Sequence, residues 1–410
     1  KKDVIISPNI LSKEYLNTFL DRSTWLYRNN GTNSQPSFRF VENNLLQGDM
    51  IDVGNGSIPA FMDTDGDGDF DLLVSSHSSD EYSSAIFLYE NIGSDSAPSF
   101  KLVSDDFLGF SRSNFYNVKI QFADVNSDHT KDLVFTATSF DDGATRLYYF
   151  ANKSTTKMDF SGVSVQRLEF ILTSSENVYL TEISGDGIPD MLVGRSEGNL
   201  EYWKNIGIKA VPLFQLVDEN FMGFSSSPLR QNLACAVADL DGDGTSDLVV
   251  GDQAGNLGVI ANFRSATAET SVQFDIVFNP LLESYTHKNL GGSLWPTVVN
   301  LFNTDRPAVV VGNSLGGVHI LRHDADKSLS DNPVINVYPN PVTKPDVLTV
   351  TADRRGTMQI ISLLGQELSN PVILQANEAY VYRLSHLAAG LYLLKFTANK
   401  KSAVQRFVIR

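Results

Sequence analysis

Two short stretches of the sequence crowd aspartates at the same spacing. They read DTDGDGDFDLLV (63–74) and DLDGDGTSDLVV (239–250). Neither stretch contains a lysine or arginine, so the carboxylates would repel one another unless a cation lies between them. Calcium suits such a loop, because it accepts about six to eight oxygen ligands at loose geometry from alternate loop positions. The spacing therefore predicts two calcium-binding loops.

The ligands are predicted from the positions within each stretch. Side chains at positions 1, 3, 5 and 9 and a backbone carbonyl at position 7 would face the ion, and the glycines let the backbone curl around it. An EF-hand is excluded, because position 12 holds Val74 or Val250 where that motif needs glutamate. The predicted ligands are Asp63, Asp65, Asp67 and Asp71 with the Asp69 carbonyl, and Asp239, Asp241, Asp243 and Asp247 with the Thr245 carbonyl.

Three weaker copies of the stretch begin at positions 124, 182 and 300. The copy at 300 has lost nearly all its acids, and no ion is expected there. The other two could bring the number of calcium sites to four, although an ordinary solvated turn is the alternative for any such cluster. Their predicted ligands are Asp124, Asn126, Asp128 and Asp132 with the Thr130 carbonyl, and Glu182, Ser184, Asp186 and Asp190 with the Ile188 carbonyl.

These stretches belong to a repeat of 57 to 61 residues. A second signature, aromatic-x-Asn-x-Gly-x4-Pro-x-Phe, recurs at 27–38, 89–100 and 203–214. Each repeat reads as four short strands with the acidic stretch between the first two, which predicts an all-β propeller. We expect about six blades in view and seven in the complete ring. Asp3 aligns with Asp71, so the first blade would be incomplete at the N-terminus, and 12–21 could form one helical insertion.

The acidic stretches resemble the FG-GAP/VCBS repeats of integrin-α-like propellers over about residues 1–330. In that family the calcium loops are mainly structural, and ligands bind elsewhere on the propeller faces. The resemblance therefore implies a calcium-stiffened binding scaffold without catalytic chemistry.

Residues 331–410 read as a separate small β-sandwich, predicted to be Ig-like. Tyr-Pro-Asn-Pro (338–341), Leu-x-Gly-x-x-Leu (363–368), Leu-x-x-Gly-x-Tyr (387–392) and a final basic-apolar strand follow in order. This order resembles the type A sorting domain of the type IX secretion system of Bacteroidota, although the chain ends in Arg410 and not in a lysine-rich segment. The resemblance implies export, surface attachment or release, and docking on the secretion machinery. A generic Ig-like accessory domain is the alternative.

Charge and motif content narrow the function classes. The net charge is −16; residues 333–410 carry nine Lys and Arg against four Asp and Glu, which gives +5 there and −21 before them. Because residues 1–332 are strongly acidic, we do not expect them to bind the phosphates of a nucleic acid. No apolar run is long enough to predict a transmembrane segment.

One stretch looks like a catalytic motif. GNSLG (312–316) fits the Gly-x-Ser-x-Gly of hydrolases, but a strand is predicted after it where that motif needs a helix. We therefore expect no catalytic residues and no enzyme.

The first interpretation is a secreted or cell-surface adhesion module that binds a glycan or a protein on the propeller. Two alternatives stay open at this point. The chain could be a structural or cargo component of a surface or secretion assembly, or the non-catalytic part of a larger secreted enzyme.

Overall fold

The computed structural model divides the chain into two compact units, Lys1–Asp52 and Val53–Arg410. Its helices, within the described residues, are two short 3-10 segments, η3 (Phe107–Arg112) and η4 (Phe221–Gly223), so the predicted all-β class is confirmed. The possible helical insertion at 12–21 and most of the linker predicted around 323–334 lie outside the described residues. The described residues are 1–7, 24–45, 48, 50–76, 83–94, 96–208, 211–266, 272–279, 281–323, 333–343, 347–363, 365–376, 378–385, 387–398 and 401–410.

The first unit contains one antiparallel sheet of three strands. Its order is β1 (Val4–Ile6), β2 (Trp25–Asn29) and β3 (Phe38–Glu42). Val4 pairs with Tyr27, which places the start of β1 beside the middle of β2.

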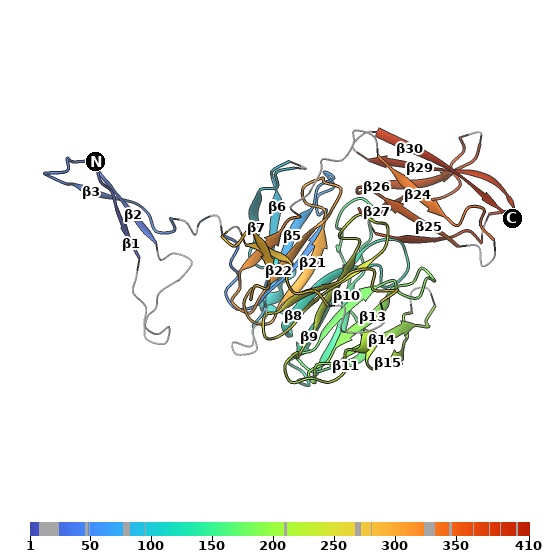
Figure 1. Ribbon diagram of the computed structural model, residues 1–410, viewed down its shortest axis with the longest axis horizontal. Helices are drawn as coiled ribbons and strands as arrows, with labels where there is room; N and C mark the ends of the chain where they lie inside the picture. The colour runs from blue at the N-terminus through green and yellow to red at the C-terminus, as the bar shows by residue number, and fades with distance from the viewer. Residues whose placement is uncertain are drawn as a thin grey trace. The chain divides into compact units, whose positions relative to one another are not determined.

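The second unit begins with five sheets built from successive repeats (Figure 1). Each sheet is an antiparallel meander, and the fourth is followed by a separate hairpin, β19 (Val277–Asn279) and β20 (Ser284–Thr286). The strands are β4 (Ser57–Met62), β5 (Asp71–Ser76), β6 (Ile86–Asn91) and β7 (Phe100–Ser104); β8 (Phe115–Ala123), β9 (Asp132–Ser139), β10 (Thr145–Phe150) and β11 (Gln166–Leu172); β12 (Asn177–Thr181), β13 (Asp190–Gly194), β14 (Leu200–Asn205) and β15 (Phe214–Asp218); β16 (Ala234–Ala238), β17 (Asp247–Gly251) and β18 (Leu257–Ile260); β21 (Trp295–Val299), β22 (Ala308–Gly312) and β23 (Val318–Leu321).

The second strand of each of the first four sheets is buried on both faces. All residues of β9, β13 and β17 are buried, as are the first five of β5. A strand covered on both sides reads as a continuous apolar run without alternation. This is why apolar residues follow the acidic stretches directly in the sequence.

The five sheets form a closed series through their first strands. Contacts run from β4 to β8, β12, β16 and β21, and β21 returns to β4. At this seam the amide of Ser57 donates to the carbonyl of Asn313 at 2.9 Å, and the amide of Asn313 donates to Ser57 Oγ at 2.9 Å. The β-propeller is confirmed. The expected six blades in view and seven in all are not confirmed, because the described residues of this unit close the ring directly from the fifth sheet to the first.

The C-terminal strands form two sheets over one core. Their orders are β24-β25-β28 and β27-β26-β29-β30, and both contribute to a cluster that includes Leu348, Met358 and Phe396. Two sheets sharing a core are the predicted sandwich; its Ig-like topology is not confirmed. The boundary predicted between residues 330 and 331 falls outside the described residues. The strands are β24 (Ile335–Tyr338), β25 (Val347–Ala352), β26 (Gly356–Ile361), β27 (Val372–Leu374), β28 (Tyr380–Arg383), β29 (Gly390–Ala398) and β30 (Lys401–Ile409).

Candidate metal centres

Each acidic stretch forms the loop between the first and second strands of a sheet. The first loop joins β4 to β5, and the corresponding loops follow β8, β12, β16 and β21. A strand, not a helix, begins at position 9 in the first four loops, as the sequence predicts. A cation in such a loop would tie together two adjacent strands of one blade.

The first and fourth loops bring three carboxylates each to one point. Ligand atoms of Asp63, Asp65 and Asp71 lie within 4.8 Å of one another, and so do those of Asp239, Asp241 and Asp247. Asp67 and Asp243, predicted as ligands, lie outside these clusters. Asp243 Oδ1 instead accepts hydrogen bonds from the amide and hydroxyl of Thr245 at 2.8 and 2.7 Å, and these bonds lower the pKa of Asp243.

The loop backbone holds the position-1 carboxylate. The amides of Gly242 and Gly244 donate to the two carboxylate oxygens of Asp239 at 2.7 and 2.8 Å. Both glycines have positive φ, at 78° and 87°, which side chains with a Cβ rarely adopt. The glycines of the motif therefore fold the loop back onto its first acid.

The position-9 aspartate connects the two sequence signatures. Asp71 Oδ1 accepts a hydrogen bond from the amide of Asn91, the asparagine of the aromatic-x-Asn signature, at 2.8 Å. The same bond recurs in the second, third and fourth sheets, and in the first unit it is made by Asp3, the residue that aligns with Asp71. The pairs are Asp132 with Asn152 at 3.0 Å, Asp190 with Asn205 at 2.9 Å, Asp247 with Asn262 at 2.8 Å and Asp3 with Asn29 at 2.8 Å.

The asparagine in turn shapes the loop after it. Asn205 Oδ1 accepts from the amides of Gly207 and Leu213 at 3.0 and 3.1 Å, and its Nδ2 donates to the carbonyl of Pro189 at 3.2 Å. A Cβ on Gly207 would lie 2.2 Å from the carbonyl oxygen of Val211. The fixed spacing of the second signature therefore comes from a compact turn built around a buried asparagine.

We expect Asn205→Ala to lower the free energy of unfolding by about 2 to 3 kcal/mol, because the amides of Gly207 and Leu213 lose the buried acceptor that holds the turn. Asn336→Ala is the matched control, since Asn336 is exposed on β24 and should change stability by less than about 0.5 kcal/mol. Urea unfolding of both variants measures the difference. Equal stabilities would show that the asparagine does not organise the turn.

Several loop acids have the raised pKa values expected of buried, crowded carboxylates. Burial, followed by repulsion from Asp67, raises the pKa of Asp69 to about 7. Burial likewise raises the pKa of Asp132 to about 8 and that of Asp247 to about 6. Asp69 Oδ1 is also a buried oxygen without a hydrogen-bond partner among the described residues. These features fit a divalent cation, which would relieve the repulsion and accept carboxylate oxygens as ligands.

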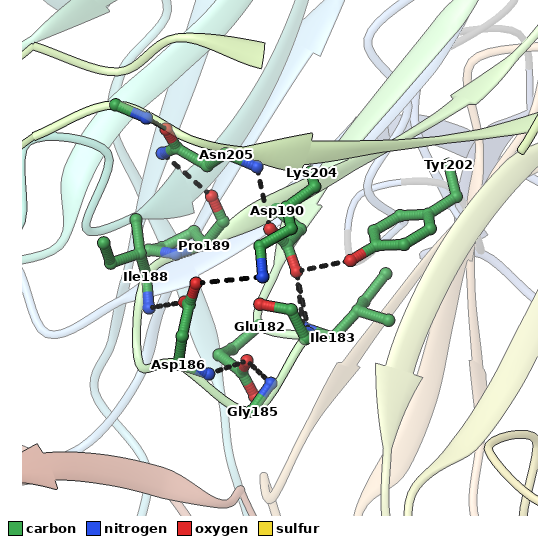
Figure 2. Close-up of polar contacts among 12 residues, drawn as sticks. Glu182, Ile183, Gly185, Asp186, Ile188, Pro189, Asp190, Tyr202, Lys204 and Asn205 are labelled. Atoms are coloured by element: carbon green, nitrogen blue, oxygen red, sulfur yellow. Dashed lines mark hydrogen bonds and ion pairs between the residues drawn. The ribbon is translucent and has the colours of Figure 1, made fainter. Parts of the chain in front are cut away.

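Protein cations lie beside the acids of the third loop, and Figure 2 shows one of them, Lys204, next to Asp186. Lys204 Nζ lies 3.4 Å from Asp186 Oδ2, and Arg264 Nη2 lies 3.5 Å from Glu182 Oε2. Asp190 accepts from the Tyr202 hydroxyl at 3.1 Å. Ser184 Oγ has no partner within the described part of the chain, and the acids of this loop do not form a three-carboxylate cluster there.

The second and fifth loops close through their own hydrogen bonds. Asp124 accepts from the amides of Asp128 and His129 at 3.0 and 2.9 Å, and Asn126 Nδ2 donates to Asp128 Oδ2 at 2.9 Å. His129 has φ of 74° where the fuller loops have glycine. In the fifth loop Asn300 and Thr304 bond each other, with the Asn300 amide at 2.8 Å from the Thr304 carbonyl. That the carbonyls of Thr130, Ile188 and Thr245 at position 7 are ligands stays a prediction.

The sequence did not reveal a polar cluster that joins three first strands. Lys119 Nζ on β8 donates to the Glu176 carbonyl at 2.8 Å and to Asn177 Oδ1 at 3.0 Å, and Trp295 Nε1 on β21 donates to the same Oδ1 at 2.9 Å. The only available signal was a lysine inside the apolar run of 115–123. Burial lowers the pKa of Lys119 to about 7, against the opposing effect of Glu176.

We expect the stability of the wild type to rise relative to Lys119→Met by about 2 kcal/mol between about pH 8 and about pH 9.5. In this window the folded lysine has lost its proton while the unfolded lysine keeps it, so raising the pH favours folding. Asp132, with a pKa of about 8, still titrates at the lower end of this range, and Cys235 ionises in the unfolded state, but both residues are present in the two proteins, so their effects cancel in the comparison. Urea unfolding at both pH values measures the effect; parallel pH dependence of the two proteins would contradict it.

Two families match parts of the chain. Residues 183–250 match the FG-GAP-like repeat, and residues 336–410 match the secretion system C-terminal sorting domain. The second unit therefore contains a β-propeller in which residues 183–250 match the FG-GAP-like repeat. It carries a type IX sorting domain, which indicates export to the cell surface or into the medium and is recognised by the type IX machinery. No helix in the described part of the chain is long and apolar enough to cross a membrane.

No curated protein matches the chain. Among solved structures, a GH43_1 enzyme from Xanthomonas citri complexed with xylotriose is 8% identical, with a TM-score of 0.40 over 68% of this chain and 93% of that one. The SapL1 lectin in complex with alpha methyl fucoside is 9% identical, with a TM-score of 0.34 over 88% and 98%. Raptor from Chaetomium thermophilum is 13% identical, with a TM-score of 0.29 over 87% and 28%. At these TM-scores none of the three supports a conclusion about this chain.

Proposed function

We propose that the chain is a non-catalytic binding module, displayed on the cell surface or secreted, whose propeller is stiffened by calcium. The observation that carries the calcium proposal is the convergence of Asp239, Asp241 and Asp247 in the fourth loop. No lysine or arginine is paired with these acids in the described part of the chain. Bound calcium would supply the missing positive charge.

The protein's own residues prepare this site. Asp239 is oriented by two loop amides, and Asp247 by the amides of Leu240 and Asn262. Asp241 is the exposed member of the cluster and completes it from the solvent side. A calcium ion held here would fix the loop to β17, and through Asn262 to the segment after β18.

Calcium titration by calorimetry tests this part of the proposal. We expect two ions per chain, with Asp65→Asn and Asp241→Asn each removing one. Asp105→Asn, an exposed acid outside the loops, is the control and should leave the stoichiometry at two. If the Asp65→Asn and Asp241→Asn variants gave the same heats of calcium binding as the wild type, the proposal would be contradicted.

We propose a glycan or a protein as the ligand of the propeller. Absence of catalysis is supported by the hairpin at 312–316, where β22 runs through the turn directly into β23 and so lacks the helix that a hydrolase nucleophile needs. Glycan-array binding by the full chain, with and without chelator, tests the glycan. Binding that survives in an unfolded control, or hydrolysis of an arrayed glycan, would contradict the proposal.

A further inference from the structure

Three acidic loops of the propeller contact the sorting domain. The contacts come from Arg355 at the start of β26 and from the segment that contains β28, and all of them lie within the unit Val53–Arg410. The loops follow β4, β8 and β12, so they share the same face of neighbouring blades. We call this face, formed by the loops 63–70, 124–131 and 182–189, the acid-loop face.

The contact at the first loop is an ion pair with a predicted calcium ligand. Arg355 Nη1 lies 2.9 Å from Asp63 Oδ2, and the two side chains are only 13% and 3% exposed. The guanidinium also lies over the Phe70 ring, at 5.2 Å from its centroid. Arg355 thus supplies positive charge at the carboxylate where a cation would otherwise bind.

The contacts at the second and third loops differ in chemistry. Lys131 Nζ pairs with Glu378 Oε2 at 3.2 Å, and the Tyr380 hydroxyl bonds to His129 Nδ1 at 2.5 Å. Arg383 Nη2 donates to the backbone carbonyl of Asp186 at 2.8 Å. These bonds do not use loop carboxylates, so they can persist when an ion is bound.

Charge complementarity supports the same pairing over a longer range. Residues 333–410 carry +5 and the preceding part carries −21. An acidic face and a basic domain attract one another at low ionic strength. No hydrogen bond or ion pair joins the fourth loop to the sorting domain within the described residues, although three of its acids converge like those of the first.

We infer that the acid-loop face is the docking surface for the chain's own sorting domain, and that Arg355 makes this docking compete with calcium at the first loop. The competition rests on the proposed function; the docking does not. An ion at the first loop would displace Arg355 from Asp63, and a docked Arg355 would weaken the ion. The fourth loop would bind calcium whether or not the sorting domain is docked.

The docking is tested on the full chain with a specific protease site placed within 324–332. After cleavage, we expect the sorting domain to co-elute with the propeller at low salt and to separate at high salt. Glu378→Lys combined with Arg383→Ala should separate the fragments already at low salt, whereas Arg406→Ala, an exposed arginine on β30, should not. Immediate separation of the wild-type fragments at low salt would overturn the inference.

The competition is tested by calcium titration in the Asp241→Asn background, where the first loop provides the remaining site. Arg355→Ala should tighten calcium binding about tenfold, because calcium no longer has to displace the buried, charged hydrogen bond between Arg355 and Asp63. Arg406→Ala should leave the affinity unchanged. Equal affinities with and without Arg355 would overturn the competition, whereas absence of calcium binding in every variant would refute the proposed function and leave co-elution as the measure of docking.

Discussion

Gly312→Ala is expected to destabilise the propeller by about 3 kcal/mol or more, because the substitution forces apart the two sheets that close the ring. A Cβ on Gly312 would lie 1.9 Å from the carbonyl oxygen of Ser57 and 2.7 Å from its carbonyl carbon. Both atoms belong to backbone, so no side-chain rotation relieves the clash. β4 and β22 would have to separate, and the seam hydrogen bonds between Ser57 and Asn313 would weaken.

Gly317→Ala is the matched control for this prediction. Gly317 stands beyond the same hairpin turn and its Cβ would meet nothing within 4 Å, so we expect a change below about 0.5 kcal/mol. Urea unfolding of the two variants measures the contrast. A mild effect of Gly312→Ala would mean that another blade lies between the fifth sheet and the first, as the seven-blade expectation requires.

Removal of calcium is expected to lower the free energy of unfolding by about 5 kcal/mol, which corresponds to two sites saturated at about 100 times their Kd. The physical reason is that the loop carboxylates are partly buried and repel one another; burial first and this repulsion second raise the pKa of Asp69 to about 7 and that of Asp247 to about 6. The loops connect adjacent strands, so loosening them affects the packing of β5 and β17. Thermal unfolding with calcium and with chelator measures the loss.

The double variant Asp65→Asn, Asp241→Asn should unfold at the same temperature with calcium and with chelator. It keeps the position-9 aspartates, which the blades need for their bonds to Asn91 and Asn262. If the double variant responded to chelator as strongly as the wild type, the stabilising ions would have to bind outside the first and fourth loops.

The local features of the fold were predictable because they depend on short-range chemistry. Glycines at positive φ, aspartates at alternate positions and apolar runs after them predict a tight loop followed by a buried strand. The structure has such loops at the predicted places, and the FG-GAP-like and sorting-domain matches confirm the two resemblances. The sequence shows both signatures, but it does not show the hydrogen bond between them. That bond, as between Asp190 and Asn205, joins residues on different strands.

The sequence could not predict which lysine and arginine side chains lie beside each acidic loop. The third loop resembles the others in sequence, yet Lys204 comes from β14 of the same sheet and Arg264 from the segment after β18 to meet its acids. Arg355 reaches the first loop from a position 292 residues away along the chain. Such partners depend on how blades and domains pack, and no spacing within a repeat encodes them.

The sequence by itself determined the repeat, the β class, the position of each acidic loop and the sorting domain, because each depends on residues close together along the chain. The tertiary structure alone decided where the ring closes, which carboxylates meet and which cations reach them. The reason is that blade packing brings distant backbone and charged groups within bonding distance, as Gly312 and Ser57 do at the seam.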